Sequence, residues 1–402
     1  MSSNSVTATS TGRAYGRPPS QPDRHLTAVG PGTPMGELLR RYWHPVGLSG
    51  DAAAIPRRVR VLGENLILFR DGQGRAGLLT ENCAHRGTSL YYGKVEDAGI
   101  RCCYHGWMFD VQGRCVDQPC EPDGGRAKHK VFQPWYPVEE RYGLVWAYLG
   151  PPDRQPVLPR YQALEDLAPG EFIETNDRSI GGGGPVIIDC NWLQHYENLV
   201  DPFHVVVLHS TFSGTQFVDA MAVMPDVSWE ESEMGVRTTS RRVLPDGKVF
   251  LRISEAAIPT LRVIPSPRVG QYGPVESIGW ILPIDDTSFR IYVAGRVQQA
   301  GELAGMRSRQ NGKLWEELTE AEHQQYPGDY EAMVSQGPIA IHAEEHLATT
   351  DRGIVMLRRR LLREVEAVAA GRDPAGVSFE ADAPPVHFTA GNFLLPATDA
   401  AT

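Results

Sequence analysis

The sequence predicts an α+β protein, with a small all-β unit followed by a larger unit in which helices flank an antiparallel sheet. Three observations support this prediction. Short β-prone runs alternate with glycine turns between residues 59 and 149, residues 150–159 have the composition of a linker, and strand-like alternation mixes with helical patterns beyond residue 190. We therefore divide the chain into an N-terminal tail and lead-in (1–40), a β unit (41–155) and a mixed unit (156–402).

Composition excludes several classes of protein. The 402 residues include 39 Lys+Arg and 49 Asp+Glu, for a net charge of −10, with 22% charged and 41% hydrophobic residues. These values are typical of a folded enzyme and argue against global disorder and against a nucleic-acid partner, which would need a dense Lys/Arg surface. No run approaches the roughly 18 apolar residues of a membrane span. Met1–Gly12 is Ser/Thr-rich without an apolar stretch, so we expect a cytoplasmic protein with no membrane partner.

The elements of the β unit follow from its turns. A short helical pattern over Met35–Tyr42 leads in. Val59–Leu62 and Leu66–Phe69 are β-prone runs separated by Gly63–Asn65, which predicts a hairpin. Further strands are expected up to Gly143–Leu149, where the linker begins.

The mixed unit is expected to begin with helical residues 190–209. Alternation then predicts antiparallel strands near 235–244, 249–264 and 276–298. Residues 302–322 and 343–371 are expected to form helices.

A first group of candidate ligands lies in the β unit, where five of the six cysteines fall between residues 83 and 120. Cys83-x-His85 is followed after 16 residues by Cys102-x-x-His105. Two Cys and two His could hold tetrahedral zinc, but zinc fingers usually pair Cys with Cys and His with His. One thiolate and one imidazole per half instead suit a Rieske 2Fe-2S cluster, in which two His replace two Cys on one iron. Cys102 is preferred to Cys103 because only Cys102 leaves two residues before His105.

A second group is Asp201-x-x-His204-x₄-His209. Two His five residues apart lie about 140° apart on a regular helix, so a shared metal requires the helix to distort or to end before His209. Asp201 can cap that helix, and both His can alternatively be core residues. A 2-His-1-carboxylate site for non-haem iron needs one more carboxylate, which periodicity does not identify.

Taken together, these motifs resemble those of a Rieske non-haem iron oxygenase α subunit, over about Leu26–Arg363. Four further segments resemble the phthalate dioxygenase and phenoxybenzoate dioxygenase branch. They are Val29–Leu38, Arg41–Pro45, Gln118–Pro122 and Ser335–Ile339.

The resemblance implies a helix-grip catalytic domain after the Rieske domain, and mononuclear Fe(II) held by His204, His209 and a carboxylate just before the Gln336-Gly-Pro segment. Asp329 is at that position. Asn198 is implied to line the substrate pocket, with a structural hydrogen bond as the alternative role. The alternatives for the carboxylate are Glu331, and more remotely Glu344 or Glu345.

The resemblance also implies a homotrimer, alone or stacked as a hexamer, in which the cluster of one copy faces the iron of its neighbour. Asp201 would bridge them, accepting hydrogen bonds from His105 across the interface and from His204. The implied partners are dioxygen, an aromatic substrate and a separate NAD(P)H-dependent flavin/iron-sulfur reductase. The implied reaction is mono- or dihydroxylation, or oxidative dealkylation or cleavage, of an aromatic carboxylate or diaryl-ether acid.

Two other functions remain open from the sequence. A Rieske-type electron-transfer protein would contain the cluster without a second iron. A zinc-stabilised binding module would contain neither iron nor sulfide.

Overall fold

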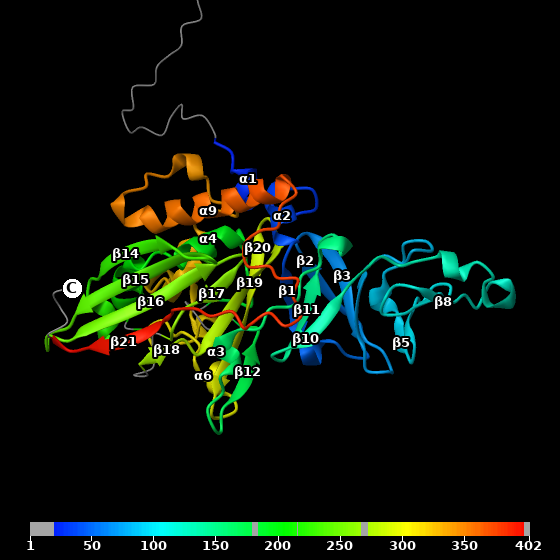
Figure 1. Cartoon of the computed structure of the whole chain (residues 1–402), viewed down its shortest axis with the longest axis horizontal. Coiled ribbons are helices and arrows are strands. Elements are labelled where there is room, and N and C mark those ends of the chain that lie inside the picture. The colour runs from blue at the N-terminus through cyan, green and yellow to red at the C-terminus, as the bar shows by residue number, and fades with distance from the viewer. Residues whose placement is uncertain (1–19, 179–183, 215, 267–271, 398–402) are drawn as a thin grey trace, which may run out of the picture.

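The computed structural model describes residues 20–178, 184–214, 216–266 and 272–397, and the expected tail Met1–Gly12 lies outside these ranges. Figure 1 shows three small sheets at one end of the molecule, and at the other a large sheet crossed by a long helix. No helix in the described ranges combines the length and apolar character needed to cross a membrane.

The lead-in forms two short helices, α1 (Arg24–Thr27) and α2 (Pro34–Leu39). Thr33 caps α2, because its Oγ1 accepts a hydrogen bond from the Gly36 amide at 3.2 Å. The observed helix begins one residue before the predicted start at Met35 and ends three residues before the predicted end at Tyr42.

The smaller part contains the three small sheets, one of which holds the predicted hairpin. Its turn is formed by Leu62 and Gly63, with φ of +47° and +82°, so the hairpin loop has two residues in left-handed conformations. The turn thus lies one residue earlier than Gly63–Asn65. The strand orders are β1 (Trp43–Leu48), β11 (Leu144–Tyr148), β10 (Val138–Arg141); β2 (Arg57–Val61), β3 (Glu64–Arg70), β4 (Ala76–Thr80), β9 (Trp135–Tyr136); and β5 (Lys94–Glu96), β6 (Gly99–Arg101), β7 (Met108–Phe109), β8 (Cys115–Asp117).

The larger part is built on one antiparallel sheet. The predicted strand regions 249–264 and 276–298 each contain two strands, and the region 235–244 contains one. The order along the sheet is β12 (Phe172–Asn176), β20 (Ser288–Val297), β19 (Ser277–Asp285), β17 (Leu261–Val263), β16 (Val249–Ala257), β15 (Gly235–Val243), β14 (Asp226–Glu231), with β13 (Ile187–Ile188), β18 (Gly273–Pro274) and β21 (Gly391–Leu395) paired beside it.

The long helix α9 (Arg352–Ala369) runs along the sheet over β14 and β15. It begins nine residues later than the predicted helix 343–371. Gly353 packs against the sheet so tightly that an added Cβ would lie 2.3 Å from Trp229 Nε1 and 2.8 Å from the Val200 carbonyl oxygen. The Trp229 indole donates to that same carbonyl at 2.8 Å. The helix is therefore fixed directly beside the segment that leads into Asp201.

The predicted helix 302–322 is wrong over most of its length. Only α6 (Glu302–Gly305) and the start of α7 (Glu320–Gln325) are α-helical there. Asn311 and Gly312 adopt φ of +46° and +80°, and two consecutive left-handed residues cannot continue a right-handed helix.

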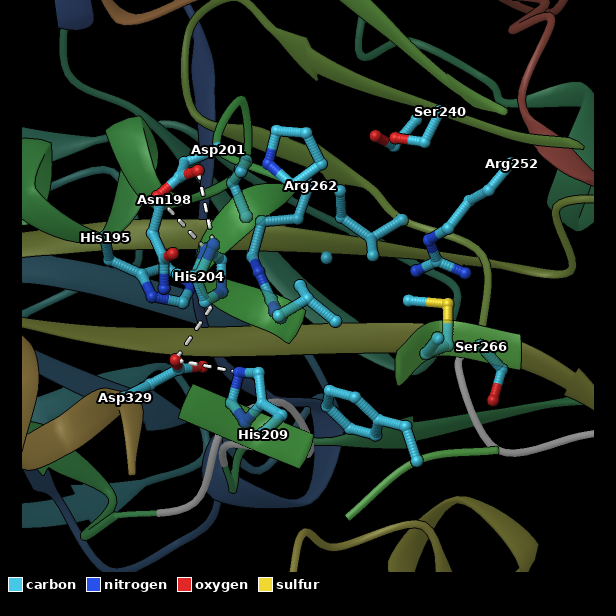
Figure 2. A pocket seen from close by; sticks show the side chains of 18 of the residues that line it. His195, Asn198, Asp201, His204, His209, Ser240, Arg252, Arg262, Ser266 and Asp329 are labelled. Atoms are coloured by element: carbon cyan, nitrogen blue, oxygen red, sulfur yellow. Dashed lines mark hydrogen bonds and ion pairs between the residues drawn. The ribbon is translucent and has the colours of Figure 1, made fainter. Parts of the chain in front are cut away.

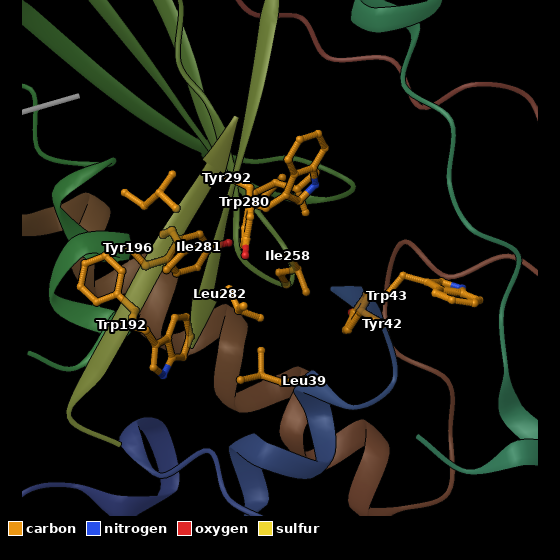
Figure 3. Packing of buried hydrophobic residues seen from close by; sticks show 14 of the residues in the cluster. Leu39, Tyr42, Trp43, Trp192, Tyr196, Ile258, Trp280, Ile281, Leu282 and Tyr292 are labelled. Atoms are coloured by element: carbon orange, nitrogen blue, oxygen red, sulfur yellow. The ribbon is translucent and has the colours of Figure 1, made fainter. Parts of the chain in front are cut away.

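The two parts share one hydrophobic core. The hairpin turn of the smaller part donates to β19 of the larger, from Leu62 to Pro283 at 3.0 Å and from Gly63 to Ile284 at 2.8 Å. Figure 3 shows residues of the lead-in and β1 beside aromatic residues of the large sheet and α4 (Trp192–Asn198). The residues labelled there are Leu39, Tyr42, Trp43, Trp192, Tyr196, Ile258, Trp280, Ile281, Leu282 and Tyr292.

Candidate functional site

The two Cys/His motifs form matching loops. The carbonyl of Cys83 accepts from the Gly87 amide at 2.8 Å, and the carbonyl of Cys102 accepts from the Gly106 amide at 3.1 Å. Both glycines have positive φ, +77° and +75°, which residues with a Cβ rarely adopt. The loops therefore turn in the same way although their Cys–His spacings differ by one residue.

In these loops the two thiols are buried and the two imidazoles lie nearer the surface. Cys83 and Cys102 are buried in a small core, whereas Cys103 is exposed, which agrees with the choice of Cys102. Burial, together with the neighbouring Cys102 thiol, raises the pKa of Cys83 to about 11 in the metal-free protein. The rings of His85 and His105 lie 4.6 Å apart between centroids, nearer the surface. Two inner thiols and two outer imidazoles fit a Rieske cluster and its two different irons.

The second group converges on one point. His204 lies in α5 (Phe203–Val207), His209 in a π-helical turn (Leu208–Phe212), and Asp329 at the first residue of α8 (Asp329–Val334). Asp329 Oδ1 lies 3.1 Å from His209 Nε2 and 3.8 Å from His204 Nε2 (Figure 2). The helix distorts from Leu208 onward, which is the condition under which His204 and His209 can share a metal.

Two neighbours orient these imidazoles. Asp201 Oδ2 lies 3.4 Å from His204 Nδ1, while its Oδ1 accepts from the Phe203 amide at 2.9 Å and so caps α5. His209 Nδ1 hydrogen-bonds to Gln216 Oε1. Each ring thereby directs Nε2 toward Asp329.

The carboxylates are held in their charged form. Burial raises the pKa of Asp329, but His209 and His204 outweigh that effect and hold the pKa well below its usual range. Burial also raises the pKa of Asp201, and the contacts with His204 and the backbone amides lower it overall.

The residues fit a divalent metal. Asp329 Oδ1 is buried and makes no hydrogen bond of acceptable geometry to any residue that the structure describes, even to His209 at 3.1 Å. Two imidazole nitrogens and one carboxylate whose ligand atoms lie within 4.8 Å of one another are the donor set of a 2-His-1-carboxylate iron site. The alternative carboxylates lie elsewhere: Glu331 contacts Gln310, Trp315 and His323, and Glu345 pairs with Arg358.

A cavity of about 160 Å³ opens from these three residues toward the concave face of the large sheet. Asn198, at the end of α4, lines it together with His195, whose buried ring nitrogens have no hydrogen-bond partner among the described residues. Figure 2 shows Arg262 reaching in beside His204, and Arg252 entering from the opposite side.

Sequence reasoning missed several of these residues. Gln216 is seven residues beyond His209, and nothing in the local pattern distinguishes it from a surface Gln. The arginines that line the cavity are Arg242, Arg252 and Arg262. Each is two positions from another residue that lines the cavity: Ser240, Ser254 or Ile264. Residues two apart on a strand face the same side, so the alternation in the sequence indicates which side each arginine faces.

A second hollow lies on the other side of His204 and Asp329 from the cavity. Asn198, Asp201, His204 and Asp329 line it as well as the cavity. Arg358 closes one side of it by pairing with Glu197 and Glu345. The orienting carboxylate Asp201 is 29% exposed, so a partner could reach it from this side.

Comparisons with known proteins agree with this chemistry. The model of the Rieske [2Fe-2S] domain matches residues 42–136. The chain is 51% identical to the phenoxybenzoate dioxygenase subunit alpha of Ectopseudomonas oleovorans, over 96% of this chain and 95% of the relative. It is 38% identical to a tert-butanol monooxygenase / tert-amyl alcohol desaturase oxygenase subunit of Aquincola tertiaricarbonis, over 88% and 78%. A solved structure of NdmA from Pseudomonas putida CBB5 shares the fold, with a TM-score of 0.60, 20% identity and coverage of 87% and 99%.

Proposed function

The chain belongs to the Rieske non-haem iron oxygenase α subunits, in the branch that contains phenoxybenzoate dioxygenase, and we propose that its substrate is an aromatic acid. It is the oxygenase component of a multicomponent system, an oxidoreductase that depends on a separate reductase for electrons. We propose an aromatic carboxylate or a diaryl-ether acid as the substrate. The expected reactions are mono- or cis-dihydroxylation, or oxidative dealkylation or cleavage.

One observation favours this reading over an electron-transfer protein. His204, His209 and Asp329 direct ligand atoms to one point at the end of a buried cavity. An electron carrier needs only the cluster, and neither a second metal site nor a cavity beside it. The geometry is that of a protein that brings a small molecule to a metal.

We assign the cluster to Cys83, His85, Cys102 and His105, and the iron to the three converging residues. When bound, these groups supply single electrons and open coordination positions at which dioxygen is activated.

The protein supplies orientation and exclusion of water. Asp201 and Gln216 hold the Nδ1 sides of His204 and His209, so that both rings keep Nε2 toward the metal. The cavity is enclosed by α4, α5 and the concave face of the sheet, and Asn198 presents its carboxamide to it. A substrate that fills the cavity displaces water from one side of the metal residues, while the second hollow reaches them from the other.

We further propose a homotrimer, with or without stacking into a hexamer. The Cys/His loops belong to the part with the three small sheets, whereas the cavity is lined by α4, α5 and strands of the large sheet. In the proposed trimer, His105 of a neighbouring copy enters the second hollow and donates to Asp201, which bridges the two metals. The division into 1–40, 41–155 and 156–402 and the cytoplasmic location belong to the same proposal.

Metal analysis with turnover tests the function. We expect three irons and two acid-labile sulfides per chain, a reduced Rieske EPR signal, and oxygen consumption with 3-phenoxybenzoate when a reductase and NAD(P)H are added. Two irons that persist after anaerobic Fe(II) reconstitution, without turnover, would indicate electron transfer. Zinc without sulfide would exclude both readings.

A further inference from the structure

Three arginines face the cavity from adjacent strand regions of the large sheet. Arg242 lies on β15, Arg252 on β16 and Arg262 on β17. All three point to the concave side, because the residues two positions away, Ser240, Ser254 and Ile264, also line the cavity. One wall of the cavity is therefore cationic.

Two of these arginines are tied to the protein. Arg242 Nε donates to the Val223 carbonyl at 2.9 Å. Arg252 donates from Nη1 to Asn392 Oδ1 at 2.9 Å and from Nη2 to the Pro265 carbonyl at 2.5 Å. These bonds fix both side chains in the sheet. Both terminal nitrogens of Arg252 are occupied, whereas Nη1 and Nη2 of Arg242 have no hydrogen-bond partner among the described residues and can support an anion held by Arg262.

Arg262 is held differently. Among the described residues its guanidinium has no hydrogen bond or ion pair, and its Nε is buried. Its cross-strand neighbours are Ala256 and Gly279, so small residues flank it on both sides. A Cβ built on Gly279 would lie 3.4 Å from Arg262 Cδ and 3.5 Å from Nη1. The side chain thus lies across this glycine, with its remaining donors toward the cavity.

The cavity lacks a matching acid. Its lining carboxylates are Asp201 and Asp329, which lie against the histidines. The internal segments 179–183, 215 and 267–271 contain no acidic residue. Burial lowers the pKa of Arg262 to about 10, and that of Arg252 to about 9, so both stay cationic at neutral pH. Asp329 acts on Arg262 and Glu276 on Arg252 only through space, because no ion pair joins them among the described residues. A buried cation without a direct anionic contact is costly, and an anionic ligand would relieve that cost.

We propose that Arg262 binds the acid group of the substrate, an inference that rests on the proposed function and specifies it. A guanidinium presents paired N–H donors that match the two oxygens of a carboxylate. Arg242 and Arg252 add positive potential from the far side of the cavity. The site therefore selects organic acids over neutral aromatic compounds of the same shape.

Calorimetric titration of the anaerobic holoprotein tests this proposal without turnover. The probes are 3-phenoxybenzoate, benzoate and phthalate, with 3-phenoxybenzamide as the neutral counterpart. We expect at least one acid to bind about tenfold or more tightly than the amide. Arg262→Met is expected to weaken binding of that acid by roughly 10- to 150-fold, the range for a hydrogen bond to a charged group, and to leave amide binding nearly unchanged.

Matched variants separate charge from geometry. Arg262→Lys keeps the charge without the planar donors and should fall between wild type and Arg262→Met. Arg241→Met makes the same charge change one residue from Arg242, at a position that does not line the cavity, and should bind the acid as wild type does. Iron content and visible absorption establish that each variant is folded.

Several outcomes would overturn the proposal. They are wild-type acid affinity in Arg262→Met, equal loss in Arg241→Met, or amide binding as tight as that of every acid. Failure of the proposed function looks different: acid binding would still depend on Arg262, but no aromatic substrate would be oxidised in the presence of reductase and NAD(P)H.

Discussion

Replacing Gln216 by Leu should weaken binding of the mononuclear iron while leaving the cluster intact. Gln216 Oε1 is the acceptor for His209 Nδ1, and its Nε2 donates to the Arg309 carbonyl at 2.7 Å. Leucine has a similar size but no acceptor. His209 is only 2% exposed, so water cannot easily replace the lost partner. Loss of such an orienting bond typically costs 10- to 100-fold in metal affinity, about 1.4–2.7 kcal/mol.

The assay is anaerobic competition for Fe(II) between the protein and a chromogenic chelator. Visible absorption of the cluster in the same sample serves as the internal control. Gln216→Glu is the comparison variant, because it keeps an acceptor for His209, although it loses the donation to the Arg309 carbonyl and adds a negative charge. Wild-type Fe(II) affinity in Gln216→Leu, or equal losses in the Leu and Glu variants, would exclude an orienting role for the Gln216 acceptor.

Three further predictions concern the proposed Asp201 bridge between the two metals, the stability of the fold at low pH, and the packing of α9. Asp201→Asn should retain both metals yet lower turnover by at least about 100-fold, since it removes the charge that couples them; normal turnover with three irons would exclude the bridge. Burial lowers the pKa of His44 to about 4. The unfolded state therefore binds the proton more readily, and about 3 kcal/mol of stability should be lost as the pH falls from about 6.5 to 4. Urea unfolding should show a flatter pH dependence for His44→Gln, and an unchanged one would refute this. Gly353→Ala should lower the free energy of unfolding by about 1–3 kcal/mol, because the new Cβ overlaps Trp229 and the Val200 carbonyl; an unchanged urea midpoint would contradict the packing argument.

The parts of the site that could be predicted from the sequence are those in which chemistry and spacing are local. Cys83 and His85 are two residues apart and His204 and His209 five, so the chain itself keeps each pair near, although the second pair also needs the π-helical turn to share a metal. The hairpin of β2 and β3 was equally accessible, since glycine and the flanking β-prone runs determine it. Its exact turn was not, because Leu62 adopts a left-handed conformation that residue preference disfavours.

The remaining parts depend on tertiary contacts. Asp329 is 120 residues beyond His209, and only the resemblance to a known family pointed to it. Arg262 was missed because an inward-facing arginine on a strand contradicts the usual rule that charge faces solvent. The rule fails here because the concave face of the sheet lines a cavity. The same face would be packed with apolar side chains if the protein bound nothing.

The π-helical turn explains how one segment can both be capped by Asp201 and direct His204 and His209 to one point. On an α-helix, His204 and His209 would point about 140° apart and could not share a metal. The Ser213 amide instead donates to the Leu208 carbonyl at 2.8 Å, a bond that spans five residues. This widened turn reduces the rotation per residue and brings His209 Nε2 to the same carboxylate oxygen as His204 Nε2. It also leaves Asp201 at the start of α5, where the carboxylate caps the helix with one oxygen and lies against His204 with the other. A regular helix in this segment would keep the cap but separate the two imidazoles, so the proposed iron site depends on the distortion.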